Sequence, residues 1–100
     1  MNKAELVGAI ADRIDGTTKK NIDLILSEAI AVVQEQVAAG NKIILVGFGS
    51  FEPKHRKERL GRNPKTGDEM TIPAQTIPHF SPGKTFKQQV RDASDTHGKN

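Results

Sequence analysis

Residues 42–67 read KIILVGFGSFEPKHRKERLGRNPKTG, and this stretch changes character halfway. Its first half places β-branched and aromatic residues around Gly47 and Gly49, a pattern typical of a strand, a tight turn and a second strand. Its second half is polar and basic and ends in the turn sequence NPKTG (63–67). The stretch therefore predicts a long hairpin.

The outer half of this hairpin has no core to cover. Between positions 52 and 71 the only apolar residues are Leu60 and Met70. Each strand of the hairpin spans about a dozen residues, or ~40 Å in extended form. Because an isolated two-stranded ribbon is only marginally stable in water, a projecting ribbon is best explained by a partner surface. We therefore predict an arm at about residues 53–75.

Two helices are predicted before the hairpin. Asn2 followed by Glu5 forms a variant capping box, and apolar residues then recur at helical spacing as far as Ile14. Thr18 is placed to cap a second helix of about 21 residues, which ends where Gly40 can adopt a left-handed cap. Together they form a helical hairpin with more apolar surface than one chain can cover.

The sequence after the arm predicts a returning strand and a last helix. EMTIPAQTIPHF (69–80) alternates apolar and polar residues, with prolines that confine it to an edge or to bulges. Ser81 is expected to cap a short helix that has Pro82 at its first position and runs to about Ala93. We expect residues 94–100 to be a disordered polar tail.

These elements predict an α+β fold in one domain, residues 1–93. It combines a helical-hairpin body, a three-stranded antiparallel sheet with a long protruding β-ribbon arm, and a short C-terminal helix. Of the 35 apolar residues, 26 lie in positions 1–51, so the core is small and is built mainly from the first half of the chain. Because so small a core rarely sustains a domain alone, we predict an obligate dimer.

Composition narrows the class of protein. The chain has no cysteine, which excludes disulfides, thiolate zinc sites and thiol catalysis. No apolar run is long enough for a membrane span and no signal-peptide core is present, so we expect a cytoplasmic protein. Residues 53–87 carry eight Lys and Arg against three Asp and Glu, and a patch this basic attracts polyanions.

The arm is the centre of this positive charge. Between residues 54 and 65 its six cations stand against the single anion Glu58, more than is needed to keep an edge strand soluble. The stretch from residue 54 to residue 62 spans ~30 Å, close to one ~34 Å turn of duplex DNA. We therefore predict that these cations bind phosphate, and they are Lys54, Arg56, Lys57, Arg59, Arg62 and Lys65.

Pro64 has two interpretations. Proline is ordinary at the second position of a turn. A rigid apolar ring at the exposed end of a cationic ribbon can also enter between stacked base pairs from the minor groove and kink the duplex. Position and neighbours favour the wedge, so Pro64 is predicted to intercalate.

Nothing in the sequence predicts an enzyme, a cofactor, a metal site or a small-molecule substrate. His55, His79 and His97 are scattered without the spacing of a metal site. No Ser/His/Asp set or pair of carboxylates is apparent, and acids are scarcest in the segment with the most cations.

The sequence resembles the HU and integration host factor family of bacterial nucleoid proteins. The resemblance rests on GFGSFEPKHRKERLGRNPKTG (47–67), MTIPA (70–74) and FSPGKTFKQQV (80–90), with the opening MNKAELV, and covers residues 1 to about 91. Two features depart from the family: the turn DGTTKK is about one residue longer, and the tail beyond Arg91 exceeds the usual length.

This resemblance implies an intertwined dimer whose two arms embrace DNA in its minor groove, bend it and compact the nucleoid. The arm-tip proline, here Pro64, intercalates in that family. The implied DNA-binding residues are the six arm cations with Asn63, Pro64, Lys84, Lys87 and Lys3. Lys84 lies in the first turn of the predicted last helix, whose free N–H groups favour a phosphate. The expected partner is double-stranded DNA, especially bent, nicked or distorted DNA.

Three alternatives stay open at this point. We predict an architectural protein that binds double-stranded DNA with little sequence preference, and a sequence-specific bender of the integration host factor type is the alternative. We expect a homodimer, and pairing with a paralogue is the alternative. A protein that binds RNA or another anionic surface would use the same ribbon, although no aromatic residue lies on the arm to stack on bases.

Overall fold

The computed structural model describes residues 1–97, and these divide into two compact units. The first unit comprises residues 1–35, and the second begins at Gln36. The boundary falls inside helix α2 (Lys19–Ala38), so the last turn of that helix belongs to the second unit. Within the described residues, no helix has both the length and the apolar character that a membrane crossing needs.

The first unit is the predicted helical hairpin. Helix α1 (Lys3–Ala11) begins as expected, because the Asn2 side chain accepts a hydrogen bond from the Glu5 N–H at 2.9 Å. It ends before Ile14, since the N–H groups beyond Asp12 bond to carbonyls three residues back and tighten the last turn. The helix is therefore shorter than its apolar pattern predicts.

Helix α2 has the predicted ends. The Thr18 hydroxyl accepts a hydrogen bond from the Asn21 N–H at 3.1 Å, and Gly40 follows the helix with a φ of +95°. Val7 of α1 and Ile22 of α2 are the two buried apolar side chains among the described residues. Four large side chains on α2 stay largely exposed in the single chain, namely Leu24, Ile25, Ile30 and Val32.

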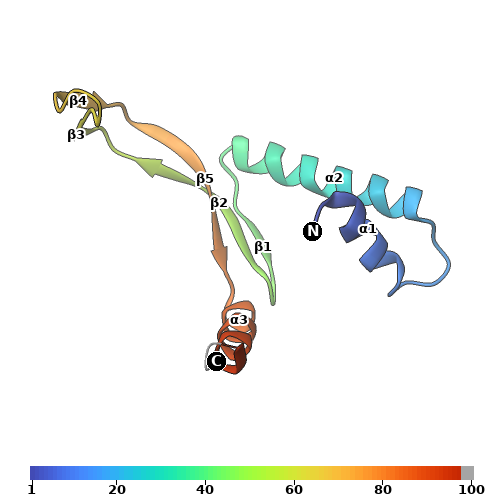
Figure 1. The fold of residues 1–100 in the computed structure, drawn as a ribbon. Coiled ribbons are helices and arrows are strands. Elements are labelled where there is room, and N and C mark those ends of the chain that lie inside the picture. Colours follow the sequence, from blue (N-terminus) through green and yellow to red (C-terminus); the bar gives the residue numbers. More distant parts are fainter. Residues whose placement is uncertain (98–100) are drawn as a thin grey trace. The chain divides into compact units, whose positions relative to one another are not determined.

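The second unit contains the predicted sheet and arm (Figure 1). Strands β1 (Ile43–Leu45), β2 (Gly49–Arg56) and β5 (Gln75–Pro82) form an antiparallel sheet in the order β1-β2-β5. Farther out, β3 (Arg59–Arg62) pairs with β4 (Glu69–Ile72) as a separate two-stranded ribbon. The arm is thus a hairpin in two segments.

Prolines fix the hydrogen-bonding phase of β2 and β5. Pro53 lies directly opposite Pro78, and neither residue has an N–H to donate. This pair must therefore be one of the non-hydrogen-bonded pairs of an antiparallel ladder, which alternate with hydrogen-bonded ones. Phe51 and Phe80, two positions away, form another such pair, where side chains are closest. Their ring centroids are 4.8 Å apart.

The same phase explains why the arm breaks. Counting outward from the Pro53–Pro78 pair, the pair of Glu58 and Pro73 falls in a hydrogen-bonded position, which proline cannot satisfy. The ladder stops at Arg56 opposite Gln75 and resumes at Arg59 opposite Ile72. Two residues on each strand are unpaired at the break, and because the number is equal on both strands, the register is the same on either side of it.

The last helix differs from its prediction at both ends. Ser81 and Pro82 belong to β5, because they pair with Ser50 and Gly49 of β2, and neither caps the helix. Helix α3 (Lys84–His97) begins after Gly83, whose carbonyl accepts the Lys87 N–H at 3.0 Å. It continues beyond Ala93 because no glycine or proline interrupts it before Gly98. Part of the expected tail, residues 94–97, is therefore helical, and residues 98–100 lie outside the described residues.

Four phenylalanines form the apolar centre of the second unit. Phe48 lies 5.2 Å from Phe80 and 5.4 Å from Phe86 between ring centroids, and Phe51 completes the cluster. Such contacts are worth ~0.5–1.5 kcal/mol per pair beyond the area that they bury. Phe48 is still 43% exposed, so one chain does not cover the cluster.

Gly49 should be indispensable to this arrangement. Its φ is +156°, and a Cβ on it would lie 2.5 Å from the Ser81 carbonyl oxygen and 2.8 Å from the Phe80 ring. We predict that Gly49→Ala lowers the free energy of unfolding by ~1–3 kcal/mol, measured by urea denaturation.

The matched control is Gly8→Ala in α1, where a Cβ meets nothing within 4 Å. It should raise stability by up to ~1 kcal/mol, because alanine is the better helix former. An unchanged urea midpoint for Gly49→Ala would contradict the close packing of β2 on β5.

Candidate nucleic-acid interface

The register divides the hairpin of β2–β5 and β3–β4 into two faces. Side chains alternate along each strand, and directly paired residues share a face. We call the side that carries Phe51 and Phe80 the aromatic face; it holds the odd positions from 49 to 61 and the even positions from 70 to 82. The opposite side is the polar face. Because the break keeps the register, the division holds along the whole arm.

The predicted arm cations lie on both faces. The polar face carries Lys54, Arg56 and Arg62, and the aromatic face carries Arg59. Lys57 lies in the break two residues before Arg59, so alternation assigns it to the aromatic face as well. All five side chains are exposed. The ion pairs found among the described residues lie elsewhere, so no arm cation is neutralised by a neighbouring carboxylate. The arm thus presents unpaired positive charge to the solvent.

The polar face continues from the arm onto the three-stranded sheet. There Glu52 lies opposite His79 and forms an ion pair with Lys42, at 3.5 Å between Oε2 and Nζ. This pairing offsets the one acid at the base of the polar face. Ser50 and Ser81 lie next in the sheet, so the surface stays polar where the arm joins it.

The tip of the arm is a braced turn. The Asn63 N–H donates to the Asp68 carbonyl at 2.9 Å, and the Gly67 N–H donates to the Asn63 carbonyl at 2.7 Å. The Asn63 side chain also accepts from the Lys65 N–H at 2.9 Å. Gly67 has a φ of +75°, as the closing position requires. Pro64 is exposed within this frame, so its ring projects from a turn that hydrogen bonds hold in one shape.

Two contacts that brace the tip were not evident from the sequence. The Arg62 guanidinium donates to the Gly67 carbonyl at 3.1 Å, so this predicted phosphate ligand also closes the turn. The Thr66 hydroxyl accepts from the Asp68 N–H at 3.3 Å. A threonine two residues before Asp68 is the usual signal for such a turn. Asn63 likewise forms the turn with its side-chain oxygen, in addition to its predicted contact with DNA.

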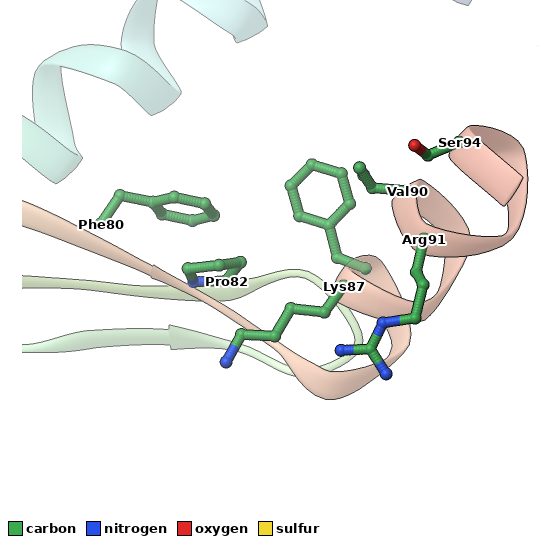
Figure 2. A pocket seen from close by; sticks show the side chains of 7 residues that line it. Phe80, Pro82, Lys87, Val90, Arg91 and Ser94 are labelled. Carbon is green, nitrogen blue, oxygen red and sulfur yellow. The ribbon is translucent and has the colours of Figure 1, made fainter. Parts of the chain in front are cut away.

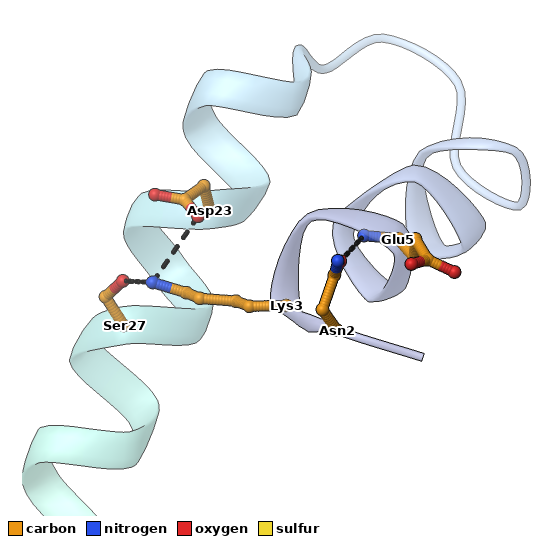
Figure 3. A network of polar contacts seen from close by, with 5 residues as sticks. All are labelled: Asn2, Lys3, Glu5, Asp23 and Ser27. Carbon is orange, nitrogen blue, oxygen red and sulfur yellow. Dashed lines mark hydrogen bonds and ion pairs between the residues drawn. The ribbon is translucent and has the colours of Figure 1, made fainter.

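The remaining predicted cations lie away from the arm. Lys3, in the first unit, forms an ion pair with Asp23 at 3.4 Å and a hydrogen bond to the Ser27 hydroxyl (Figure 3). Lys84 is the first residue of α3, as predicted, and Lys87 follows one turn later. Lys3 is therefore held by its own unit, whereas no ion pair is found for Lys84 or Lys87 within the described chain.

An open pocket of about 510 Å³ lies between α3 and the end of β5 (Figure 2). Its apolar wall is formed by Phe80, Pro82, Phe86 and Val90, and its rim by Lys87, Arg91 and Ser94. Val90 is 57% exposed. The pocket thus combines an apolar wall with a cationic rim, and none of the described side chains that line it is acidic.

No described residues form a group of three or more His, Cys, Asp or Glu that could hold a metal ion. The chemistry that the arrangement supports is the binding of polyanions: exposed cations spaced along a ribbon, with a rigid turn at its end.

Comparisons with known proteins agree with this arrangement. The family model described as bacterial DNA-binding protein matches residues 1–91. The DNA-binding protein HU of Synechocystis sp. is 55% identical over 95 residues, covering 90% of this chain and 95% of that protein. Integration host factor subunit beta of Marinobacter nauticus is 43% identical, covering 93% and 95% of the two chains. The HU chain of an Anabaena HU–DNA cocrystal structure is 51% identical with a TM-score of 0.82, covering 90% of this chain and 97% of that one.

Proposed function

The chain belongs to the family of bacterial DNA-binding proteins, and from this premise we propose that it is an architectural protein that binds and bends double-stranded DNA with little sequence preference. The observation that carries the proposal is the row of exposed, unpaired cations along an arm that covers no core. We propose that the protein acts in the bacterial nucleoid. We propose no enzymatic activity for it.

The polar face of the arm supplies most of the affinity. Lys54 and Arg56 project from β2 two residues apart, about 6–7 Å in an extended strand, which is the spacing of successive phosphates along one DNA strand. Each phosphate that they neutralise releases counterions, and this gain does not depend on the base sequence. The affinity is therefore largely electrostatic and unspecific.

The tip supplies the bend. Pro64 is a compact apolar ring on a turn fixed by Asn63 and Arg62, so that inserting it between base pairs costs little conformational entropy. Unstacking one base step costs a few kcal/mol, which the additional contacts of a bent duplex repay. Nicked or bent DNA has already met part of this cost and should bind more tightly.

The functional unit is a dimer, because a single chain leaves much of its apolar surface uncovered. Leu24, Ile25 and Val32 on α2 are at least half exposed, and Phe48 of the phenylalanine cluster is 43% exposed. The negative charges of Glu28 and Glu35 on α2 are complementary to the positive charges of Lys87 and Arg91 at the rim of the pocket. A second copy of the chain would cover these surfaces and place two arms on one duplex.

Dimerisation predicts that stability depends on protein concentration. If folding and association are one step, each tenfold rise in concentration of the purified chain should add ~1.4 kcal/mol to the apparent unfolding free energy. Urea unfolding followed by circular dichroism measures this. A midpoint independent of concentration would exclude an obligate dimer, and a purified chain that does not fold would indicate a paralogous partner.

Electrostatic binding predicts a steep dependence on salt. If the two arms engage ~6–10 phosphates, affinity for a random duplex should fall ~10³–10⁵-fold between about 50 and 200 mM salt, measured by fluorescence anisotropy. A flat salt dependence would refute the phosphate-binding arm. Strong preference for one sequence in competition would instead assign the protein to the integration host factor type, which the similarity to integration host factor subunit beta keeps as the second candidate.

Pro64→Ala should separate bending from binding. Its phosphate contacts remain, so affinity for linear duplex should stay within about threefold, while the wedge is lost. Circularisation of short DNA fragments should fall markedly. Thr66→Ala is the matched control, because it alters the same turn without touching the wedge. If Pro64→Ala circularises DNA as the wild type does, Pro64 is only a turn residue.

A further inference from the structure

The pocket on α3 extends beyond the part of the chain that the family model matches. That model ends at residue 91, whereas α3 continues to His97. Ser94, which lies in this added segment, lines the pocket together with Val90 (Figure 2). Val90 is 57% exposed, so its apolar side chain is open to a partner. The added segment thus prolongs an apolar surface that the single chain leaves uncovered.

Positive charge lines the rim of this pocket. Lys87 and Arg91 lie one turn apart on α3, and both are exposed. No ion pair is found for either cation among the residues that the structure describes. A surface that combines uncovered apolar side chains with unpaired cations fits a partner surface that is apolar and acidic.

Helix α2 carries such a surface on the side that faces away from α1. The contacts of α2 with the Lys3 side chain of α1 are made by Asp23 and Ser27 (Figure 3). At ~100° per residue, the opposite side of α2 carries two exposed acids among large apolar side chains that are at least half exposed. We call this surface the α2 strip, and it is formed by Leu24, Ile25, Glu28, Val32 and Glu35.

The length of α3 fits the α2 strip. From Leu24 to Glu35 the strip is ~17 Å long at the rise of an α-helix. A helix from Lys84 to Arg91 would be ~12 Å long and would leave part of the strip uncovered. The 14 residues of α3 give ~21 Å. The added segment therefore supplies the length that is needed to cover the strip.

We propose that α3, lengthened by residues 92–97, packs on the α2 strip of a second copy of this chain. The rim cations Lys87 and Arg91 then face the acids of the strip. The inference rests on the proposed function, because it assumes that the functional unit is a dimer. Since one chain carries both surfaces, a two-fold axis forms the contact twice, and the last helix of each copy holds the other copy.

Exchanging the charges tests the pairing of the two helices. One variant reverses the acids of the strip, Glu28→Lys with Glu35→Lys, and the other reverses the rim cations, Lys87→Glu with Arg91→Glu. Each variant alone sets like charges against each other in both contacts, whereas a mixed dimer restores opposite charges in both. Sedimentation equilibrium measures dimer dissociation for each variant and for an equimolar mixture refolded together from urea. DNA is left out, because Lys87 is also expected to bind it.

Each variant alone should dissociate at least about tenfold more readily than the wild type, or fail to fold, because like charges face each other. The mixture should fold and dimerise within about threefold of the wild type. A mixture that dimerises no better than its components would overturn the proposal. Variants that dimerise alone as well as the wild type does would overturn it too.

A second pair of variants tests the added segment. Ser94→Glu puts an acid on the pocket side of α3, where it faces the acids of the strip. Gln89→Glu adds the same charge at an exposed position on the far side of the helix. Ser94→Glu should weaken dimerisation at least about fivefold, and Gln89→Glu less than about twofold. Equal effects of the two variants would show that the added segment lies outside the interface, and the proposal would fail.

Failure of this contact can be told apart from failure of the proposed function. If the wild type dimerises and the mixture of charge-reversed variants does not, the dimer stands and only the contact between α3 and the α2 strip is wrong. If the wild type itself sediments as a folded monomer, it is the proposed dimer that fails.

Discussion

The structure of the arm depends on the missing N–H groups of its prolines. Pro53 and Pro78 can face each other only in a non-hydrogen-bonded pair, and this sets the phase of the whole ladder. The phase brings Phe51 and Phe80 together at the sheet and makes Pro73 incompatible with the ladder farther out. A restriction on backbone donors thus positions the aromatic cluster and divides the arm.

A second constraint is the shortage of apolar surface that one chain can bury. Val7 and Ile22 are the buried apolar side chains of the described residues, while much of α2 remains exposed. We therefore expect the aromatic face of the sheet to meet protein, and propose the polar face for the ligand. The side that we propose for DNA binding thus follows from the side that we expect a second copy to cover.

Much of this could be predicted from the sequence, because the decisive residues act locally. Asn2 and Thr18 begin helices and Gly40 ends one, each through hydrogen bonds to near neighbours, and the sequence predicts all three correctly. The prediction that Ser81 and Pro82 begin the last helix was wrong, because these residues pair with β2. A Ser-Pro sequence typical of a helix start is the same whether or not a distant strand pairs with it. Local sequence cannot show that pairing.

The candidate site was predictable in composition and less so in arrangement. The six arm cations are evident from the sequence, and their division between two faces follows from alternation alone. The double role of Arg62, which donates to the Gly67 carbonyl across the turn, depends on the three-dimensional closure of the tip. The break at Pro73 requires the register, which only the structure supplies.

The unchanged register across the break limits how the arm can vary in length. Removing one residue from each strand would rotate every outer side chain to the other face, exchanging Arg62 with the glycine beside it. Removing two from each strand would restore the faces and shorten the reach by ~7 Å. Arms of this kind should therefore lengthen or shorten in steps of two residues per strand, and a designer of longer or shorter arms would have to follow the same rule.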